Sequence, residues 1–91
     1  MLAELVPERT DALLQRGETY GQSRVICGVH WQSDIDAGRL VVAGAVARRH
    51  GGPGPLADMQ AARQEIRQAQ AAGVAPSRDC LAEAKALGGA R

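Results

Sequence analysis

Aromatic side chains are almost missing from this 91-residue sequence, which has no phenylalanine and only Tyr20 and Trp31 as aromatic residues. A hydrophobic core must therefore be built from alanine, valine, leucine and isoleucine. Small aliphatic side chains of this kind favour closely spaced helices over a β-sandwich rich in aromatic residues. The length suits one small domain with a single core.

A strong charge bias and long apolar runs are also missing. Eleven Lys and Arg face ten Asp and Glu, for a formal net charge of +1, and no basic stripe is present, so nucleic-acid binding is not expected. No apolar run reaches the roughly 20 residues that cross a bilayer. Residues 1–7 lack the basic and long apolar regions of a secretory signal, so a chain made as written is expected in the cytoplasm.

Cysteine and serine patterns typical of metal or nucleophile sites are incomplete. Cys27 and Cys80 permit one disulfide without requiring it, and the apolar neighbours of Cys27 favour a buried thiol. Cys27 and His30 form a C-x-x-H pair, but no second pair completes a zinc site, so no metal is predicted. Ser23 is not in a G-x-S-x-G elbow, because Val25 takes the place of the last glycine.

Helical periodicity dominates what is present, and it predicts an all-α fold, a small bundle of about four helices. The expected helices run from Glu8 to about Val29, from an N-cap at Ser33 to about Arg49, from Pro55 to Gly73, and from a Pro76–Ser77 cap to Gly88–Gly89. The tail 88–91 is expected to fray. Residues 1–70 and a helical tail, 71–91, form the predicted division of the chain.

The faces of these helices carry further predictions. Gly17, Gly21 and Gly28 share one face of the first helix, which predicts close approach by another backbone or a ligand. Residues 40–47 include no polar residue, so the second helix is expected to be buried on all sides, by more helices than the chain supplies. The third helix has a thin apolar stripe, formed by Leu56, Met59, Ala62, Ile66 and Ala69. The last is expected to turn Leu81, Ala84 and Leu87 inward.

One short stretch carries a chemical pattern. His30 and Asp34 are four residues apart at the start of a helix, so the carboxylate can hold one ring nitrogen while the other attacks phosphorus. Arg24 offers a planar fork for two phosphate oxygens, and a helix that ends near Gly28 would let it approach His30. The next helix would bring its anion-favouring N-terminal end to the same spot.

The spacing Ser-Arg-x5-His-x3-Asp is similar to the third motif of the type 2 phosphatidic acid phosphatase and vanadium haloperoxidase superfamily. The surrounding block 21–39, GQSRVICGVHWQSDIDAGR, closely resembles bacterial class A non-specific acid phosphatases, and the resemblance covers about residues 2–70. It implies that His30 is the nucleophile, that Asp34 orients it and that Arg24 binds phosphate. It also implies a helical, metal-independent periplasmic enzyme without a cofactor, which hydrolyses phosphomonoesters at acidic pH and binds vanadate as a phosphate mimic.

The chain departs from the family by having neither Lys-x6-Arg-Pro nor Pro-Ser-Gly-His. In the family these motifs supply further phosphate contacts and the histidine that protonates the leaving group. The chain is therefore expected to be the C-terminal part of a longer enzyme, and weakly active or inactive alone. The alternative is a non-catalytic helical module whose exposed apolar faces bind a partner helix or drive homo-oligomerisation.

Five other polar or aromatic positions have narrower expectations. Ser23 is expected to support the site by hydrogen bonding, and Trp31 either walls the substrate pocket or simply packs. His50 is expected to be a solvated partner of a helix C-terminus. Asp36 and Arg39 are expected to cap and pair locally.

Overall fold

The computed structural model describes residues 1–88, which are all-α and contain no strand. In chain order the elements are α1 (Leu2–Leu5), the 3₁₀ turn η1 (Pro7–Arg9), α2 (Thr10–Ile26), α3 (Gln32–His50), α4 (Pro53–Ala71) and α5 (Cys80–Ala86). The prediction of an all-α chain with about four helices is confirmed, since four of these helices have seven or more residues. Within residues 1–88 no helix combines the length and the apolar character that a membrane crossing requires.

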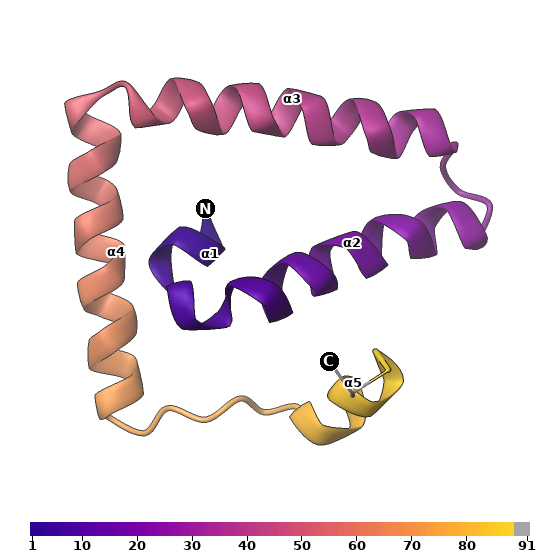
Figure 1. Ribbon diagram of the computed structural model, residues 1–91. Coiled ribbons are helices and arrows are strands. Elements are labelled where there is room, and N and C mark those ends of the chain that lie inside the picture. The colour runs from indigo at the N-terminus through magenta and orange to yellow at the C-terminus, as the bar shows by residue number, and fades with distance from the viewer. Residues whose placement is uncertain (89–91) are drawn as a thin grey trace.

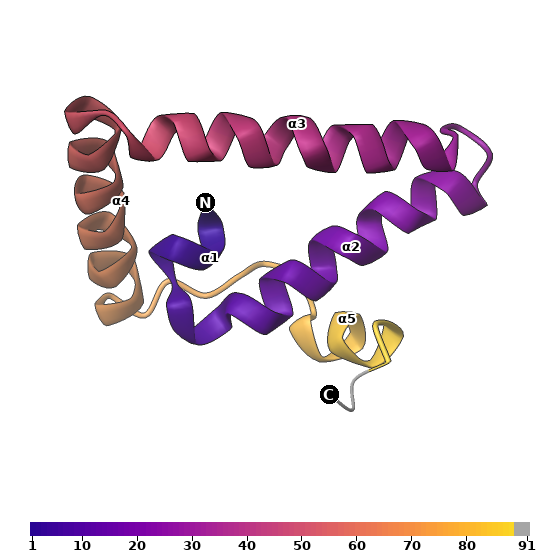
Figure 2. The ribbon, with the colours of Figure 1, turned by 45° about the horizontal axis from the view of Figure 1, so that its top comes forward.

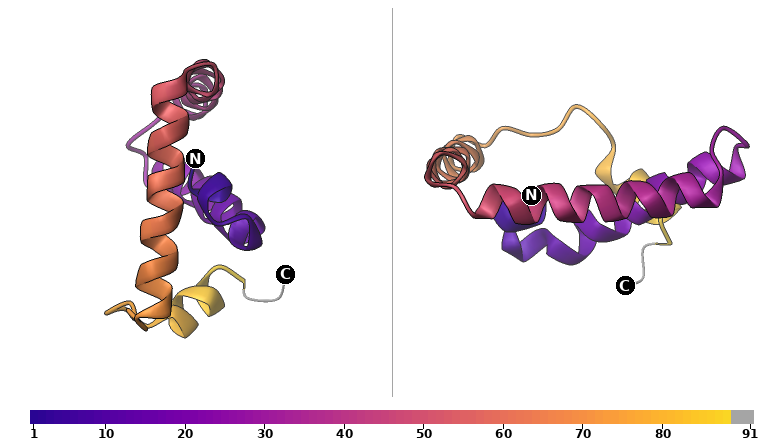
Figure 3. Two further views of the ribbon diagram at one scale, coloured as in Figure 1. Left: turned by 90° about the vertical axis from the view of Figure 1, so that its left-hand side faces the viewer. Right: turned by 90° about the horizontal axis from the view of Figure 1, so that it is seen from above.

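Three long helices form an open frame around the short N-terminal helix (Figure 1). α2 and α3 meet at a tight turn and diverge from it, and α4 runs from the far end of α3 across the open side. α1 lies inside the frame, where it contacts α2 and α4 (Figure 2). The frame is flat, as Figure 3 shows, with extents of 38 × 34 × 21 Å. α5 lies on the outer side of α2, where Arg16 Nε is 2.7 Å from Glu83 Oε1.

The turn between α2 and α3 is set by glycine. Gly28 has φ of +73°, a left-handed conformation that ends many helices, so its predicted role as the end of the first helix is confirmed. The Val29 amide donates to the Arg24 carbonyl over 3.1 Å and the Gly28 amide to the Val25 carbonyl over 2.9 Å, which is a Schellman motif. Gly73 ends α4 in the same way, with φ of +70°.

Close approach of α3 to α2 occurs at only one of the two glycines inside α2. A Cβ atom added to Gly21 would lie 3.2 Å from Ile35 Cγ2 and 3.6 Å from Arg39 Nη2. A Cβ added to Gly17 would meet nothing within 4 Å. The predicted close approach of another backbone is therefore correct at Gly21 and wrong at Gly17 and Gly28. At Gly17 the two helices have diverged, and a Cβ added to Gly28, in the turn, would also meet nothing within 4 Å.

Polar groups hold α1 inside the frame. The Glu4 carbonyl accepts hydrogen bonds from Arg63 Nε at 3.2 Å and Nη2 at 3.0 Å, and the Glu4 carboxylate pairs with His50 Nε2. Hydrogen bonding from the chain's terminal ammonium, assisted by the charge of His50, lowers the pKa of Glu4 although partial burial opposes this. His50 is half-exposed at the end of α3 as expected, but its pairing with Glu4 was not predicted.

The described chain has no buried residue. Its radius of gyration is 15.8 Å, whereas about 12 Å is typical of a compact domain of this length. The prediction that the second helix is buried on all sides is therefore wrong for the isolated chain: Leu40, Val41 and Val42 are 76%, 72% and 60% exposed. The physical reason is that α2 and α4 touch α3 only near its two ends, leaving its middle without a neighbour.

Two predicted helix caps are corrected. α3 begins after Trp31, whose amide donates to Asp34 Oδ2 over 2.9 Å, so Asp34 rather than Ser33 closes the cap. α5 begins after Asp79, whose carboxylate accepts from the amides of Leu81 and Ala82, so the Pro76–Ser77 cap is wrong. In both places an aspartate offers a charged acceptor that competes successfully with a serine nearby.

Other outcomes concern individual side chains. The stripe on α4 is partly buried at Met59, Ala62, Ile66 and Ala69, whereas Leu56 is exposed and the helix begins at Pro53 rather than Pro55. Of the three residues expected to turn inward on α5, only Leu87 is partly buried. Cys27 is exposed, contrary to prediction, and both cysteines are free thiols. Of the tail expected to fray, 89–91 lie outside the described residues.

Candidate active site

The residues of the predicted site come from the end of α2, the turn after it and the first turn of α3. The Arg24 carbonyl accepts the amide of His30 over 3.2 Å, in addition to that of Val29. The backbone of His30 is therefore tied directly to the backbone of Arg24 across the turn. The approach of the Arg24 guanidinium to the His30 ring stays a prediction.

His30 and Asp34 form the central contact of the site. His30 Nδ1 lies 3.5 Å from Asp34 Oδ2, and both side chains are half-exposed. The same Oδ2 accepts the amide of Trp31 over 2.9 Å. The backbone bond holds the carboxylate at the start of α3, and the carboxylate in turn positions the Nδ1 side of the imidazole. Nε2, the other ring nitrogen, has no recorded partner within residues 1–88.

The start of α3 adds favourable electrostatics for an anion. α3 begins at Gln32, two residues after His30, so its positive end lies beside the imidazole. Arg24 is partly buried in the last turn of α2. A phosphate group brought to His30 would therefore lie beside the positive end of α3.

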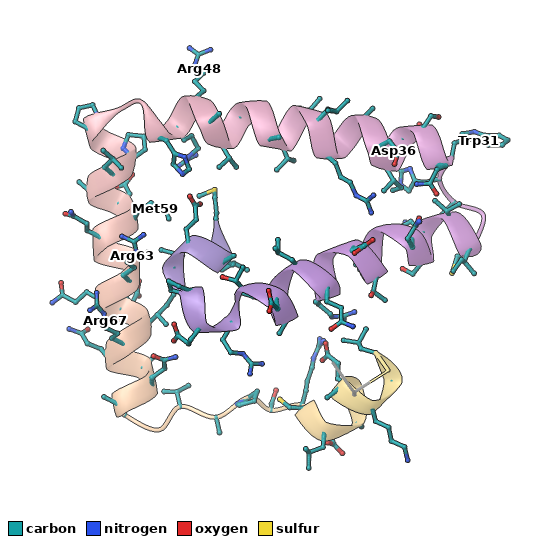
Figure 4. The ribbon with its side chains drawn as sticks, in the orientation of Figure 1. Trp31, Asp36, Arg48, Met59, Arg63 and Arg67 are labelled. Atoms are coloured by element: carbon teal, nitrogen blue, oxygen red, sulfur yellow. The ribbon has the colours of Figure 1, made fainter. Side chains whose placement is uncertain are left out.

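The two predicted supporting residues do not contact His30 or Asp34 through their side chains. The Ser23 hydroxyl donates to the carbonyl of Tyr20 over 2.6 Å, within its own helix. Trp31 is 80% exposed and points away from the frame at the start of α3 (Figure 4). The packing interpretation of Trp31 is therefore wrong in this chain, and a role as a pocket wall stays a prediction.

Asp36 and Arg39 form the expected local pair, but the expectation that Asp36 caps the helix is wrong, because Asp34 makes the cap. Arg39 Nη1 lies 3.8 Å from Asp36 Oδ1, and Gln32 Nε2 donates to the same oxygen over 3.1 Å. These are exposed local pairs on the first turns of α3. Over the described 88 residues, no three His, Cys, Asp or Glu side chains gather closely enough to hold a metal ion.

Comparison with known proteins identifies relatives with a named activity. The chain is 52% identical over 66 residues, or 72% of its length, to the non-specific acid phosphatase of Providencia stuartii. It is 41% identical over 76 residues to an acid phosphatase of Zymomonas mobilis, and 48% identical over 66 residues to the non-specific acid phosphatase of Salmonella typhimurium. The chain is a homologue of the non-specific acid phosphatases.

The matched region is a limited part of these relatives. The chain covers 27% of the Providencia stuartii protein and 29% of the Zymomonas mobilis protein, so it spans little more than a quarter of their length. No protein-family model and no solved structure matches this acid phosphatase homologue. The division of the chain into residues 1–70 and a tail, 71–91, stays a prediction.

Two contacts near or behind the site escaped the sequence interpretation. The sequence predicts that Asp34 holds His30 but not that it caps α3; the i, i+3 spacing from Trp31 could have indicated the cap, because capping boxes place an acidic residue at that position. The sequence predicts close approach along the whole glycine face of the first helix and does not single out the contact of Gly21 with Ile35. No local signal distinguishes Gly21 from Gly17, since the difference depends on how α3 crosses α2.

Proposed function

We propose that this acid phosphatase homologue provides the nucleophile half of a phosphomonoesterase site. His30 Nε2 attacks the phosphorus of a phosphomonoester, a nitrogen–phosphorus bond forms, and the bond to the ester oxygen breaks. The leaving alkoxide takes a proton and departs as the alcohol. Water then attacks the phosphohistidine, which releases inorganic phosphate and restores the imidazole. The observation that carries the proposal is the contact of His30 Nδ1 with Asp34 at 3.5 Å, which leaves Nε2 as the attacking nitrogen.

Asp34 and Arg24 have separate roles in this mechanism. The Asp34 carboxylate keeps the proton on Nδ1 and stabilises the positive charge that the ring acquires when Nε2 becomes phosphorylated. Arg24 binds the phosphoryl group, because its planar guanidinium can donate hydrogen bonds to two phosphate oxygens at once. The start of α3 adds a fixed partial positive charge beside the phosphoryl group. Substrates are phosphomonoesters, and vanadate occupies the same site as inorganic phosphate.

The same 91 residues lack a group that protonates the leaving alcohol. His50 is the only other histidine, and it pairs with Glu4 at the opposite end of α3. A general acid contributes about 10²–10⁴-fold to the rate, and the loss of further phosphate contacts multiplies that deficit. We therefore expect this polypeptide by itself to bind phosphate or vanadate weakly and to hydrolyse phosphomonoesters at most feebly. Metal independence and a periplasmic location belong to the same proposal.

The test uses the two histidines as probe and control. Vanadate is titrated into the purified chain while the imidazole signals are followed by NMR, and His50→Gln assigns the signal of His30 without touching the site. The expected result is a saturable shift of the His30 signal alone, weakened about tenfold or more in Arg24→Ala. Arg48→Ala is the matched control, because Arg48 points outward from α3 away from α2 (Figure 4).

Hydrolysis of p-nitrophenyl phosphate completes the test. A slow rate that persists in EDTA, disappears in His30→Ala and is unchanged in His50→Gln is the expected result. A His30 signal that does not respond to vanadate contradicts the site. Robust turnover that His30→Ala abolishes contradicts only the expectation of feeble activity, since it means that the two absent motifs are dispensable.

A further inference from the structure

The C-terminal helix α5 docks on the fold through side chains alone. Within residues 1–88, its backbone makes no close approach to another helix. It has seven residues, fewer than the roughly 12–15 that an isolated helix needs to be even marginally stable in water. Residues 71–80, which lead to α5, are all exposed. The helix therefore depends for its stability on the surface on which it docks.

That surface is the outer side of α2. Arg16 Nε lies 2.7 Å from Glu83 Oε1, and Gln15 Nε2 donates to the Leu87 carbonyl over 3.4 Å. The apolar residues that line the groove between the two helices are Ala12, Leu13, Ala84 and Leu87. The interface pairs a cation of α2 with an anion of α5. An α5 that belongs to another copy of the chain would therefore find the same contacts on this α2.

The segment between α4 and α5 has the properties of a hinge. The Val74 amide donates to the Ala69 carbonyl over 3.1 Å, and within the described part of the chain residues 75–78 make no backbone hydrogen bond. Pro76 restricts Ala75 to extended conformations. Figure 1 shows the segment as an extended trace between the two helices. Rotations in this segment can therefore redirect α5 without breaking a backbone hydrogen bond.

We propose that α5 is an exchangeable arm, which docks on α2 of a second copy of the chain while the α5 of that copy docks here. Each interface of the resulting two-fold dimer then pairs Arg16 of one copy with Glu83 of the other. The contacts between α2 and α5 are the same in the closed monomer and in the exchanged dimer. The conformation of the hinge and the cost of association therefore decide between the two forms.

Concentration sets when exchange occurs. An arm on a short linker acts on its own chain at an effective concentration in the mM range, so the exchanged dimer is expected at chain concentrations of about 1 mM. The candidate active site lies at the C-terminal end of α2, away from the groove, and takes no part in the exchange. The proposal is therefore independent of the proposed function.

Reversed charges distinguish exchange between copies from docking within one chain. Arg16→Glu and Glu83→Arg each place like charges at the contact between α2 and α5, so each variant alone is expected to be monomeric. In an exchanged heterodimer of the two variants, one interface carries both substitutions and the other carries neither, so both interfaces pair opposite charges. Docking within one chain gives no such rescue, because each variant keeps its own like charges.

Light scattering at about 1 mM measures the mass of each variant alone and of their equimolar mixture. The mixture is expected to dimerise about tenfold more tightly, or better, than either variant alone. The matched control replaces Glu83→Arg by Glu65→Arg, an equal charge change at an exposed position of α4, and its mixture with Arg16→Glu should stay monomeric. A mixture with Glu83→Arg that is no more dimeric than this control would overturn the proposal.

Shortening the hinge provides a second test. Deletion of residues 75–77 removes about 10 Å of reach, which opposes docking within one chain and leaves α2 of a second copy accessible. The deletion variant is expected to dimerise at concentrations about tenfold lower than the full chain, and Arg16→Glu should abolish this dimer. A deletion variant that remains monomeric, or a dimer that Arg16→Glu leaves unchanged, would show that α5 is not exchanged.

Discussion

Replacing Gly21 by alanine should distinguish the crossing of α2 and α3 from ordinary helix propensity. Within an α-helix, glycine to alanine stabilises by about 1 kcal/mol when the new methyl group meets nothing. Gly17, one turn earlier on the same helix, is such a position, since no atom lies within 4 Å of its added Cβ. Gly17→Ala is therefore expected to raise the free energy of unfolding by about 0.5–1 kcal/mol.

At Gly21 the same methyl group meets an obstacle. Its Cβ would lie 3.2 Å from Ile35 Cγ2, which is closer than ordinary van der Waals contact. Ile35 cannot rotate away cheaply, because one χ1 rotamer is strongly preferred for isoleucine in a helix. Overpacking of this kind costs about 1–3 kcal/mol. The free energy of unfolding of Gly21→Ala is therefore expected to lie about 1–3 kcal/mol below that of Gly17→Ala, which makes Gly21→Ala neutral to destabilising.

Urea unfolding followed by circular dichroism at 222 nm measures the difference. Ile35→Ala removes the obstructing methyl group. The double variant Gly21→Ala, Ile35→Ala should therefore be more stable than the sum of the two single changes in the free energy of unfolding predicts. This difference is a coupling free energy of about 1 kcal/mol or more. Equal gains from Gly17→Ala and Gly21→Ala, or additivity of the double variant, would refute the close crossing at Gly21.

Two further predictions concern carboxylates. The pKa of Glu4 in the folded chain lies below its ordinary value of 4.5, so the pairing with the terminal ammonium and His50 stabilises the chain above that pH and is lost as the pH falls through the lowered pKa. The urea midpoint of Glu4→Gln should therefore fall less steeply between pH 6 and 3 than that of the unsubstituted chain. Parallel curves for the two proteins would contradict the pairing. Asp34→Ala removes the acceptor of the Trp31 amide and should cost about 1 kcal/mol at the start of α3, whereas Asp36→Ala, which removes exposed local pairs, should cost only a few tenths. Amide hydrogen exchange over the first turn of α3 checks this, and equal protection in both variants would show that Asp34 is not the cap.

Glycines predict the helix ends correctly, because a residue in the left-handed conformation ends a helix through hydrogen bonds among its immediate neighbours in the chain. Gly28 and Gly73 both have positive φ, and each closes a Schellman motif within six residues of chain. Serines predict the helix starts less well. α3 begins after Trp31, whose amide donates to Asp34, and α5 begins after Asp79. More than one residue in each region could accept an amide at the helix start, and the charged acceptors prevail.

Burial was the least predictable property. An apolar segment from residue 40 to 47 predicts a buried helix, and that inference is sound only when enough chain exists to cover it. In this chain α2 and α4 contact α3 near its ends, so its middle remains exposed. The exposure of Cys27 and Leu81 has the same origin, since neither has a neighbouring helix on its outer side.

The sequence by itself determined the long helices, their glycine ends and the contact of His30 with Asp34 beside the turn between α2 and α3. His30 and Asp34 meet because residues four apart in a helical start lie on one side, whatever the rest of the chain does. Only the tertiary structure decided that Gly21 rather than Gly17 meets α3, and that Glu4 joins His50 and Arg63, 59 residues further along. Those contacts depend on helix crossing angles, which arise from packing among distant segments rather than from local spacing.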